Sequence, residues 1–111
     1  MFQCFLKDND LRYDERLPLK EDYDMTLQQL NKYRKVLRVN KFFYRVKQAE
    51  NVGGCASYRN FEFEKEQLNA LVNKWGSKIV RMDNADRSHN LKKEKKKIDF
   101  NPIIKPPIKG V

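Results

Sequence analysis

The sequence is poor in the residues on which enzyme sites most often depend. Its single histidine, His89, lies in a polar stretch, so a histidine-dependent catalytic triad held on rigid elements is not expected. It contains no CxxC, no HExxH and no glycine-rich phosphate loop, and Gly53 and Gly54 fall in an expected hairpin turn. Acidic residues are plentiful in 8–24, but no rigid strand there would present them to a basic cleft. The sequence therefore predicts a non-enzymatic protein with no metal and no cofactor.

Cysteines and long apolar runs are also scarce. Cys4 and Cys55 lie in strand-like runs without the spacing of metal ligands, which favours two reduced thiols over a disulfide. No apolar run approaches the roughly 18 residues of a membrane span, and the stretch 1–6 is too short for the apolar part of a signal peptide. We therefore expect a cytoplasmic protein with no membrane contact.

Basic residues are abundant but unevenly placed. Lys and Arg number 24 against 15 Asp and Glu, for a formal net charge of +9. The stretch 8–24 runs against this trend with seven acidic and three basic residues. Residues 31–59 hold eight basic residues and one acid, and residues 84–111 hold eight basic residues and three acids. A basic excess concentrated in two segments predicts a polyanionic partner or an acidic protein surface, with solubility alone as the alternative.

A β-hairpin is predicted over residues 41–64, because side chains alternate on both sides of a glycine-containing loop at 51–54. Phe42 would lie opposite Phe63, and Tyr44 opposite Phe61, on an apolar face. Cationic and aromatic side chains would share the other face: Lys41, Phe43, Arg45, Lys47 and Tyr58. The alternative is one helix from Thr26 to about Gly53, since no Pro or Gly interrupts that stretch.

The remaining patterns predict two helices and two further strands. A first strand over 1–7 is followed by a long acidic loop, 8–24, in which Leu11, Tyr13, Leu17 and Leu19 could pack against the core. A helix begins near Thr26 with an apolar stripe that reaches Leu37. A second helix covers 64–75 and stops at Gly76, before a last strand over 77–83.

This order of elements predicts an α+β, ferredoxin-like βαββαβ fold, with a four-stranded antiparallel sheet and both helices on one face. The predicted domain covers 1–83, and a winged-helix arrangement with 26–38 as the recognition helix is the alternative. Residues 84–111 form a predicted basic tail that Pro102, Pro106 and Pro107 keep extended. The isoleucines of this tail could dock on the sheet, on a partner or on a second copy in a homodimer.

The open face of such a sheet would combine rings that stack on bases with cations that meet phosphates. In architecture alone this layout is similar to the RNA-recognition motif, and no residue roles follow from that likeness. We therefore predict a small basic protein that contacts nucleic acid, either RNA or DNA, through the open face and the basic tail. The predicted contact residues are Lys7, Lys32, Lys35, Arg38, Lys41, Phe43, Arg45, Lys47, Tyr58, Lys92, Lys93, Lys95, Lys96 and Lys97.

A second hypothesis is a regulator or inhibitor, of the kind that phages and mobile elements encode, that binds a nucleic-acid-handling protein such as a polymerase or a nuclease. The acidic stretch 8–24 favours this hypothesis slightly, because negative charge repels phosphate. A third is a component of a ribonucleoprotein, with the tail threaded into the particle. The same face could also be neutralised by Glu62 and Glu64 or covered by the tail.

Overall fold

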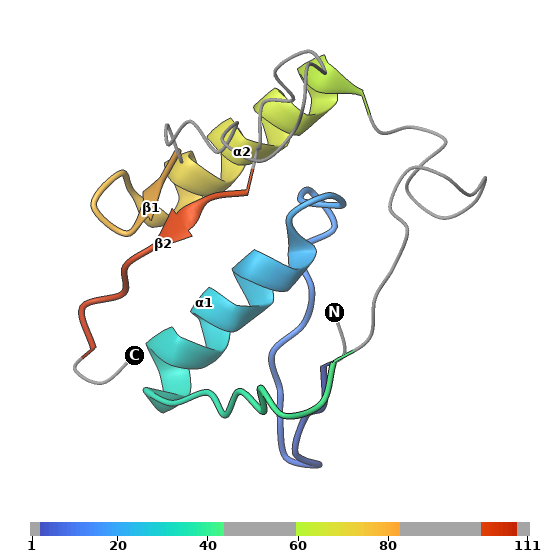
Figure 1. Cartoon of the computed structure of the whole chain (residues 1–111), viewed down its shortest axis with the longest axis vertical. Helices are drawn as coiled ribbons and strands as arrows, with labels where there is room; N and C mark the ends of the chain where they lie inside the picture. The colour runs from blue at the N-terminus through green and yellow to red at the C-terminus, as the bar shows by residue number, and fades with distance from the viewer. Residues whose placement is uncertain (1–2, 44–59, 83–100, 109–111) are drawn as a thin grey trace.

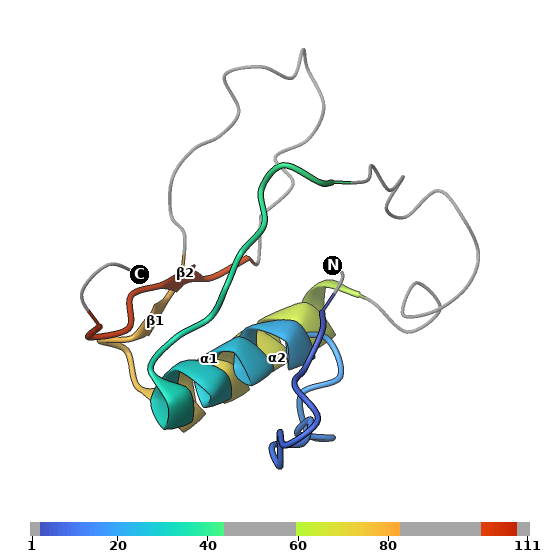
Figure 2. The ribbon, with the colours of Figure 1, turned by 90° about the horizontal axis from the view of Figure 1, so that it is seen from below.

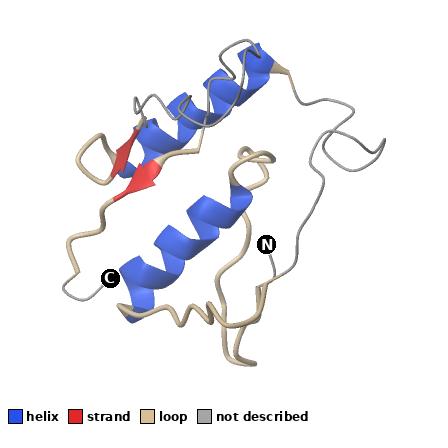
Figure 3. Cartoon of the chain, in the orientation of Figure 1, coloured by secondary structure: helices blue, strands red, loops and turns tan. Residues whose placement is uncertain are grey.

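The computed structural model describes residues 3–43, 60–82 and 101–108. Over these residues the chain forms a small α+β domain with two helices and a two-stranded antiparallel sheet (Figure 3). The elements are α1, Glu21–Tyr33; α2, Phe61–Trp75; β1, Val80–Arg81; and β2, Ile103–Ile104. The full ferredoxin-like βαββαβ arrangement is not confirmed, because this set contains neither the first strand nor the hairpin that the pattern predicted.

Helix α1 is displaced toward the N-terminus relative to its prediction. It begins at Glu21 instead of near Thr26, so Thr26 is not its cap and instead donates its hydroxyl to the carbonyl of Asp22 within the helix, at 2.8 Å. Lys20 occupies the N-cap position without a side-chain cap hydrogen bond. Acidic residues in the first turn suit the positive end of the helix dipole. The acidic loop is therefore shorter than predicted, because its last residues are helical.

Helix α2 begins where the second hairpin strand was predicted. The side chain of Asn60 accepts a hydrogen bond from the N–H of Phe63 at 2.8 Å, which caps the helix. Phe61 and Phe63 are therefore helical, and their predicted pairing with Tyr44 and Phe42 is wrong. Local alternation over so few residues also fits the first turn of a helix, and the cap selects the helix. The predicted stop at Gly76 is confirmed, where φ is +88°.

The predicted first strand is also wrong over the described residues 3–7, which form no regular element. Instead this stretch packs on the loop that follows it. Tyr13 donates its hydroxyl to the Gln3 side chain at 2.7 Å, and its ring meets that of Phe5 edge-on at 6.2 Å. A strand needs a partner for its backbone groups, and neither of the two described strands pairs with this stretch.

Strand β1 pairs with a segment of the predicted tail. Val80 lies opposite Ile104 and Arg81 opposite Ile103, and the N–H of Lys105 continues the pairing with a 2.8 Å hydrogen bond to the carbonyl of Ile79. The predicted strand over 77–83 is thus confirmed only at its centre. Its partner is an edge strand preceded by the buried Pro102, a position that proline tolerates.

Among the described residues, four buried side chains from four parts of the chain form one cluster of the core: Leu17, Leu27, Leu71 and Val80. Leu17 comes from the acidic loop, and its neighbour Leu19 is also buried, so the predicted packing of these leucines is confirmed. Tyr13, also expected to pack there, is exposed. Burying each leucine contributes roughly 1.5–3 kcal/mol, which fixes this loop against the helices.

The two helices lie side by side and run in the same general direction, with the short sheet beside the C-terminal end of α2 (Figures 1 and 2). Residues 34–43 leave the C-terminal end of α1 and run apart from both helices (Figure 2). The helices and the sheet thus pack together, and residues 34–43 lie outside this packed part.

Candidate nucleic-acid interface

Residues 34–43, here called the basic segment, begin where α1 ends. Arg34 adopts the left-handed conformation, with φ of 59°, and its N–H donates to the carbonyl of Leu30 at 3.1 Å. This conformation turns the chain out of the helix, so the predicted continuation of the helix to Arg38 is wrong. The predicted apolar stripe leaves the core at this point: Leu30 is buried, whereas the next two stripe residues, Tyr33 and Leu37, are exposed, Leu37 to 90%.

Every residue of the basic segment is exposed. The segment contains no acid, and its four cations are Arg34, Lys35, Arg38 and Lys41. Its apolar side chains are uncovered as well, with Phe42 76% and Phe43 78% exposed. Exposed large apolar side chains in such a run are typical of an interaction site.

The cations of this segment have no ion-pair partner within residues 3–43, 60–82 and 101–108. Among the residues that the structure describes, no carboxylate forms an ion pair with Lys35, Arg38 or Lys41. Such unpaired cations create a positive potential along the segment, which favours a polyanionic ligand.

Lys32, in the last turn of α1, differs from these cations because its ammonium group pairs with Asp10. Tyr33 also donates its hydroxyl to Asp10, at 3.2 Å. The hydrogen bonds from Lys32 and then Tyr33 lower the pKa of Asp10, and the same contact raises the pKa of Lys32. Lys32 is therefore already engaged and is not counted in the interface.

The structure brings only part of the predicted contact set together. Lys35, Arg38, Lys41 and Phe43 lie along the basic segment, where residues 41–43 belong to no strand, and residues 44–59 of the predicted hairpin lie outside the described part of the chain. Lys7 lies on a separate turn of the N-terminal stretch, closed by the 3.0 Å bond from the Asn9 N–H to the Leu6 carbonyl. The other predicted residues lie outside the described part of the chain: Arg45, Lys47, Tyr58, Lys92, Lys93, Lys95, Lys96 and Lys97.

A second group of charged residues surrounds one buried carboxylate between the helices. Asp24 is fully buried, and its carboxylate accepts hydrogen bonds from the Trp75 indole at 2.7 Å, the Gln28 amide at 2.7 Å and the Lys74 ammonium at 2.8 Å. These donors come from both helices, so the carboxylate joins α1 to α2. Because each oxygen already has a donor, this cluster supports the fold.

Lys74 extends the cluster to the acidic loop. Its ammonium also lies 2.8 Å from the Asp14 carboxylate, to which the guanidinium of Arg16 donates two hydrogen bonds, at 2.8 and 2.9 Å, and the Arg16 backbone N–H a third, at 3.0 Å. Arg16 first and Lys74 second hold the pKa of Asp14 well below its usual range. Burial lowers the pKa of Lys74, but its hydrogen bonds to Asp14 and Asp24 outweigh burial and leave that pKa raised.

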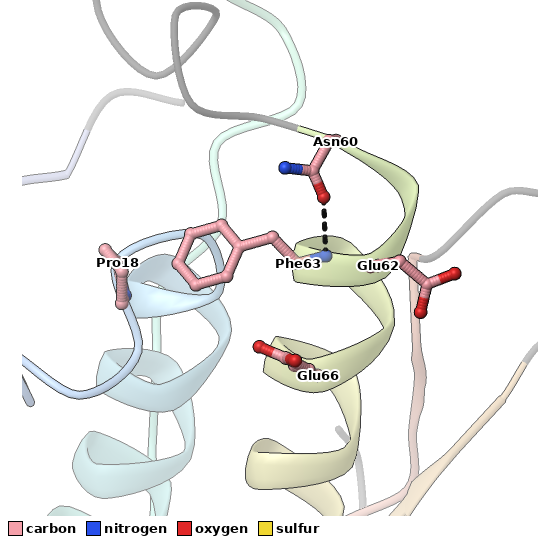
Figure 4. Close-up of a pocket in the computed structure, with 5 residues that line it drawn as sticks. All are labelled: Pro18, Asn60, Glu62, Phe63 and Glu66. Atoms are coloured by element: carbon pink, nitrogen blue, oxygen red, sulfur yellow. Dashed lines mark hydrogen bonds between the residues drawn. The ribbon is translucent and has the colours of Figure 1, made fainter.

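A shallow pocket lies between the turn at Pro18 and the first turns of α2 (Figure 4). It is lined by Pro18, Asn60, Glu62, Phe63 and Glu66, and Figure 4 shows the cap bond from Asn60 at its rim. Its charged groups are two carboxylates, which repel phosphate, so the pocket does not extend the candidate interface. No cluster of three metal-binding side chains occurs within residues 3–43, 60–82 and 101–108.

The sequence reasoning missed the Asp24 cluster and the buried ion pair of Lys20 with Glu64, at 2.7 Å. Asp24 falls at the end of the predicted acidic loop, where it suits the positive end of the predicted helix, and Lys20 has no predicted role. One signal was available: a tryptophan in an apolar stripe needs a hydrogen-bond acceptor when its indole is buried. The identity of that acceptor was not readable, because it lies far away in the sequence.

Neither helix in the described part of the chain has the length and apolar character needed to cross a bilayer. Comparisons with models of protein families, with characterised proteins and with solved structures found no match to this chain.

Proposed function

We propose that this chain is a small, basic, non-enzymatic cytoplasmic protein that binds nucleic acid, and that the basic segment 34–43 is its main contact. The observation that carries the proposal is the run of four exposed cations without an acid, of which Lys35, Arg38 and Lys41 have no carboxylate partner among the described residues. Each cation that meets a phosphate releases condensed counterions, which favours binding and makes the affinity depend on salt.

The lysine run at 92–97, outside the described residues, is a predicted second contact. Runs of this kind add affinity for phosphate without sequence preference. In this proposal the basic segment supplies the defined contact, and the lysine run strengthens it.

The proposal is tested by a salt titration of binding, measured by fluorescence anisotropy with labelled RNA and DNA. The variant Lys35→Gln/Arg38→Gln/Lys41→Gln should weaken binding at least about tenfold and flatten the dependence of log affinity on log salt by about 2–3. A matched control, Lys65→Gln/Lys78→Gln/Arg81→Gln, removes the same charge from exposed positions elsewhere. Equal effects of the two variants would show that net charge alone matters and would contradict the proposal.

One observation favours the second candidate function, a regulator that binds a nucleic-acid-handling protein. The basic segment also exposes aliphatic side chains, Val36, Leu37 and Val39, which neither stack on bases nor pair with phosphates. An acidic, partly apolar protein surface would use them. The variant Leu37→Ser/Val39→Ser should leave nucleic-acid binding unchanged and should abolish capture of such a partner.

A further inference from the structure

We infer that the nucleic acid bound by the basic segment is single-stranded, and that the rings of Phe42 and Phe43 stack on its unpaired bases. This inference rests on the proposed function and narrows its ligand.

The two rings are available for stacking. Phe42 and Phe43 are adjacent, more than three-quarters exposed, and engaged in no ring contact within the described residues, where the one aromatic pair is Phe5 with Tyr13. Stacking on an aromatic side chain is the main sequence-tolerant contact that proteins make with unpaired bases. In a duplex the faces of the bases are already stacked on one another, so these rings would find no partner there.

The cations lie at a suitable distance from the rings. The basic segment forms no helix or strand, and a chain spans at most about 3.3–3.6 Å per residue. Lys41 directly precedes Phe42, and Arg38 lies within roughly 15 Å of it along the chain. Lys41 could therefore meet a phosphate beside a base stacked on Phe42, and Arg38 could meet one further along the same strand.

The shape of the segment argues against duplex readout. The major groove admits an α-helix or a two-stranded β-ribbon, and the basic segment is neither over its described residues. A duplex would therefore meet the cations alone, through its phosphates. This difference predicts that the rings contribute to single-strand affinity and contribute nothing to duplex affinity.

The test compares a labelled 15-nucleotide single strand, as RNA and as DNA, with the corresponding 15-base-pair duplex. Replacing Phe42 and Phe43 by alanine should weaken single-strand binding roughly 5- to 100-fold per ring and leave duplex binding unchanged. The variant Phe42→Leu/Phe43→Leu keeps an apolar side chain and removes the ring, so it should lose nearly as much. Because both residues are exposed, the melting temperature of each variant should match that of the parent chain.

The failure of this inference is distinguishable from the failure of the proposed function. Stacking alone would be overturned if the chain bound duplex as tightly as single strand and this binding were lost in the Lys35→Gln/Arg38→Gln/Lys41→Gln variant. The leucine variant would then keep its binding. Absence of binding to any strand at low salt would overturn both. An equal loss in Leu37→Ala/Val39→Ala would show a general apolar contact and would also overturn stacking.

Discussion

Two regions of the molecule, the contact between α1 and α2 and the basic segment, place charged side chains in opposite surroundings. Between the helices, Asp24 and Lys20 are almost completely buried, and both have charged partners. Along the basic segment, Lys35 and Arg38 are exposed and have no such partner within the described residues. A buried charge without its partner is strongly destabilising, whereas an exposed one remains hydrated. Of the two regions, the basic segment is therefore the one whose charges are available to a ligand.

Apolar side chains show the same division. Leu27 and Leu71 fill the core, and Leu37 lies 90% exposed only one helical turn beyond the end of α1. Exposure of this kind has no role in holding the fold together. Mutations between the helices should therefore change the stability of the fold, and mutations in the basic segment should change binding.

The largest expected effect is that of Asp24→Ala, which leaves the Trp75 indole and the Lys74 ammonium without their shared acceptor. We expect a loss of about 3–5 kcal/mol in the free energy of unfolding, measured by urea titration, with binding by any remaining folded protein unchanged. The control Asp8→Ala removes an exposed acid and should stay within about 0.5 kcal/mol. A loss below about 1 kcal/mol for Asp24→Ala would show that the cluster does not join the helices.

One substitution made in both regions sharpens the comparison. Lys20→Gln breaks a buried ion pair with Glu64, and about 3 kcal/mol of stability should be lost. Lys35→Gln should change stability by less than about 0.5 kcal/mol and should weaken nucleic-acid binding. Thermal melts and anisotropy on both variants check the pair, and the reverse pattern in either assay would contradict the division.

The smallest expected effect is on the stability of the fold at acidic pH. The pKa of Asp14 in the folded protein lies below its ordinary value of 3.8, because Arg16 and Lys74 favour the carboxylate. As pH falls below about 4 the unfolded chain takes up this proton first, so stability present at neutral pH is lost toward the lower folded pKa. Asp14→Asn should flatten the fall in stability below pH 4 in thermal melts. Asp8→Asn should leave that fall as steep as in the parent chain.

The sequence predicted elements best where the pattern was long and local. Leu68, Leu71 and Trp75 recur at helical spacing and Gly76 follows, which located the C-terminal end of α2. It predicted them worst where the pattern was short. Three residues of alternation around Phe61 and Phe63 fit a strand or the first turn of a helix, and the Asn60 cap decided between them.

Pairing partners and end points lay beyond what local patterns hold. The partner of Val80 is Ile104, from a segment predicted to be a tail, and the pairing depends on two stretches that are distant in the sequence. The start of the basic segment was also beyond the local pattern. Leu37 continues the apolar stripe in the sequence but lies exposed in the structure.

The sequence by itself determined the charge of this protein, the composition of the basic segment and the apolar stripe of its second helix, because these depend on residue identity and local spacing. The tertiary structure alone decided which charges are neutralised, which leucines are exposed and which strand pairs with β1. The physical reason is that burial and pairing are properties of two surfaces in contact, and one surface of each contact comes from a distant part of the chain.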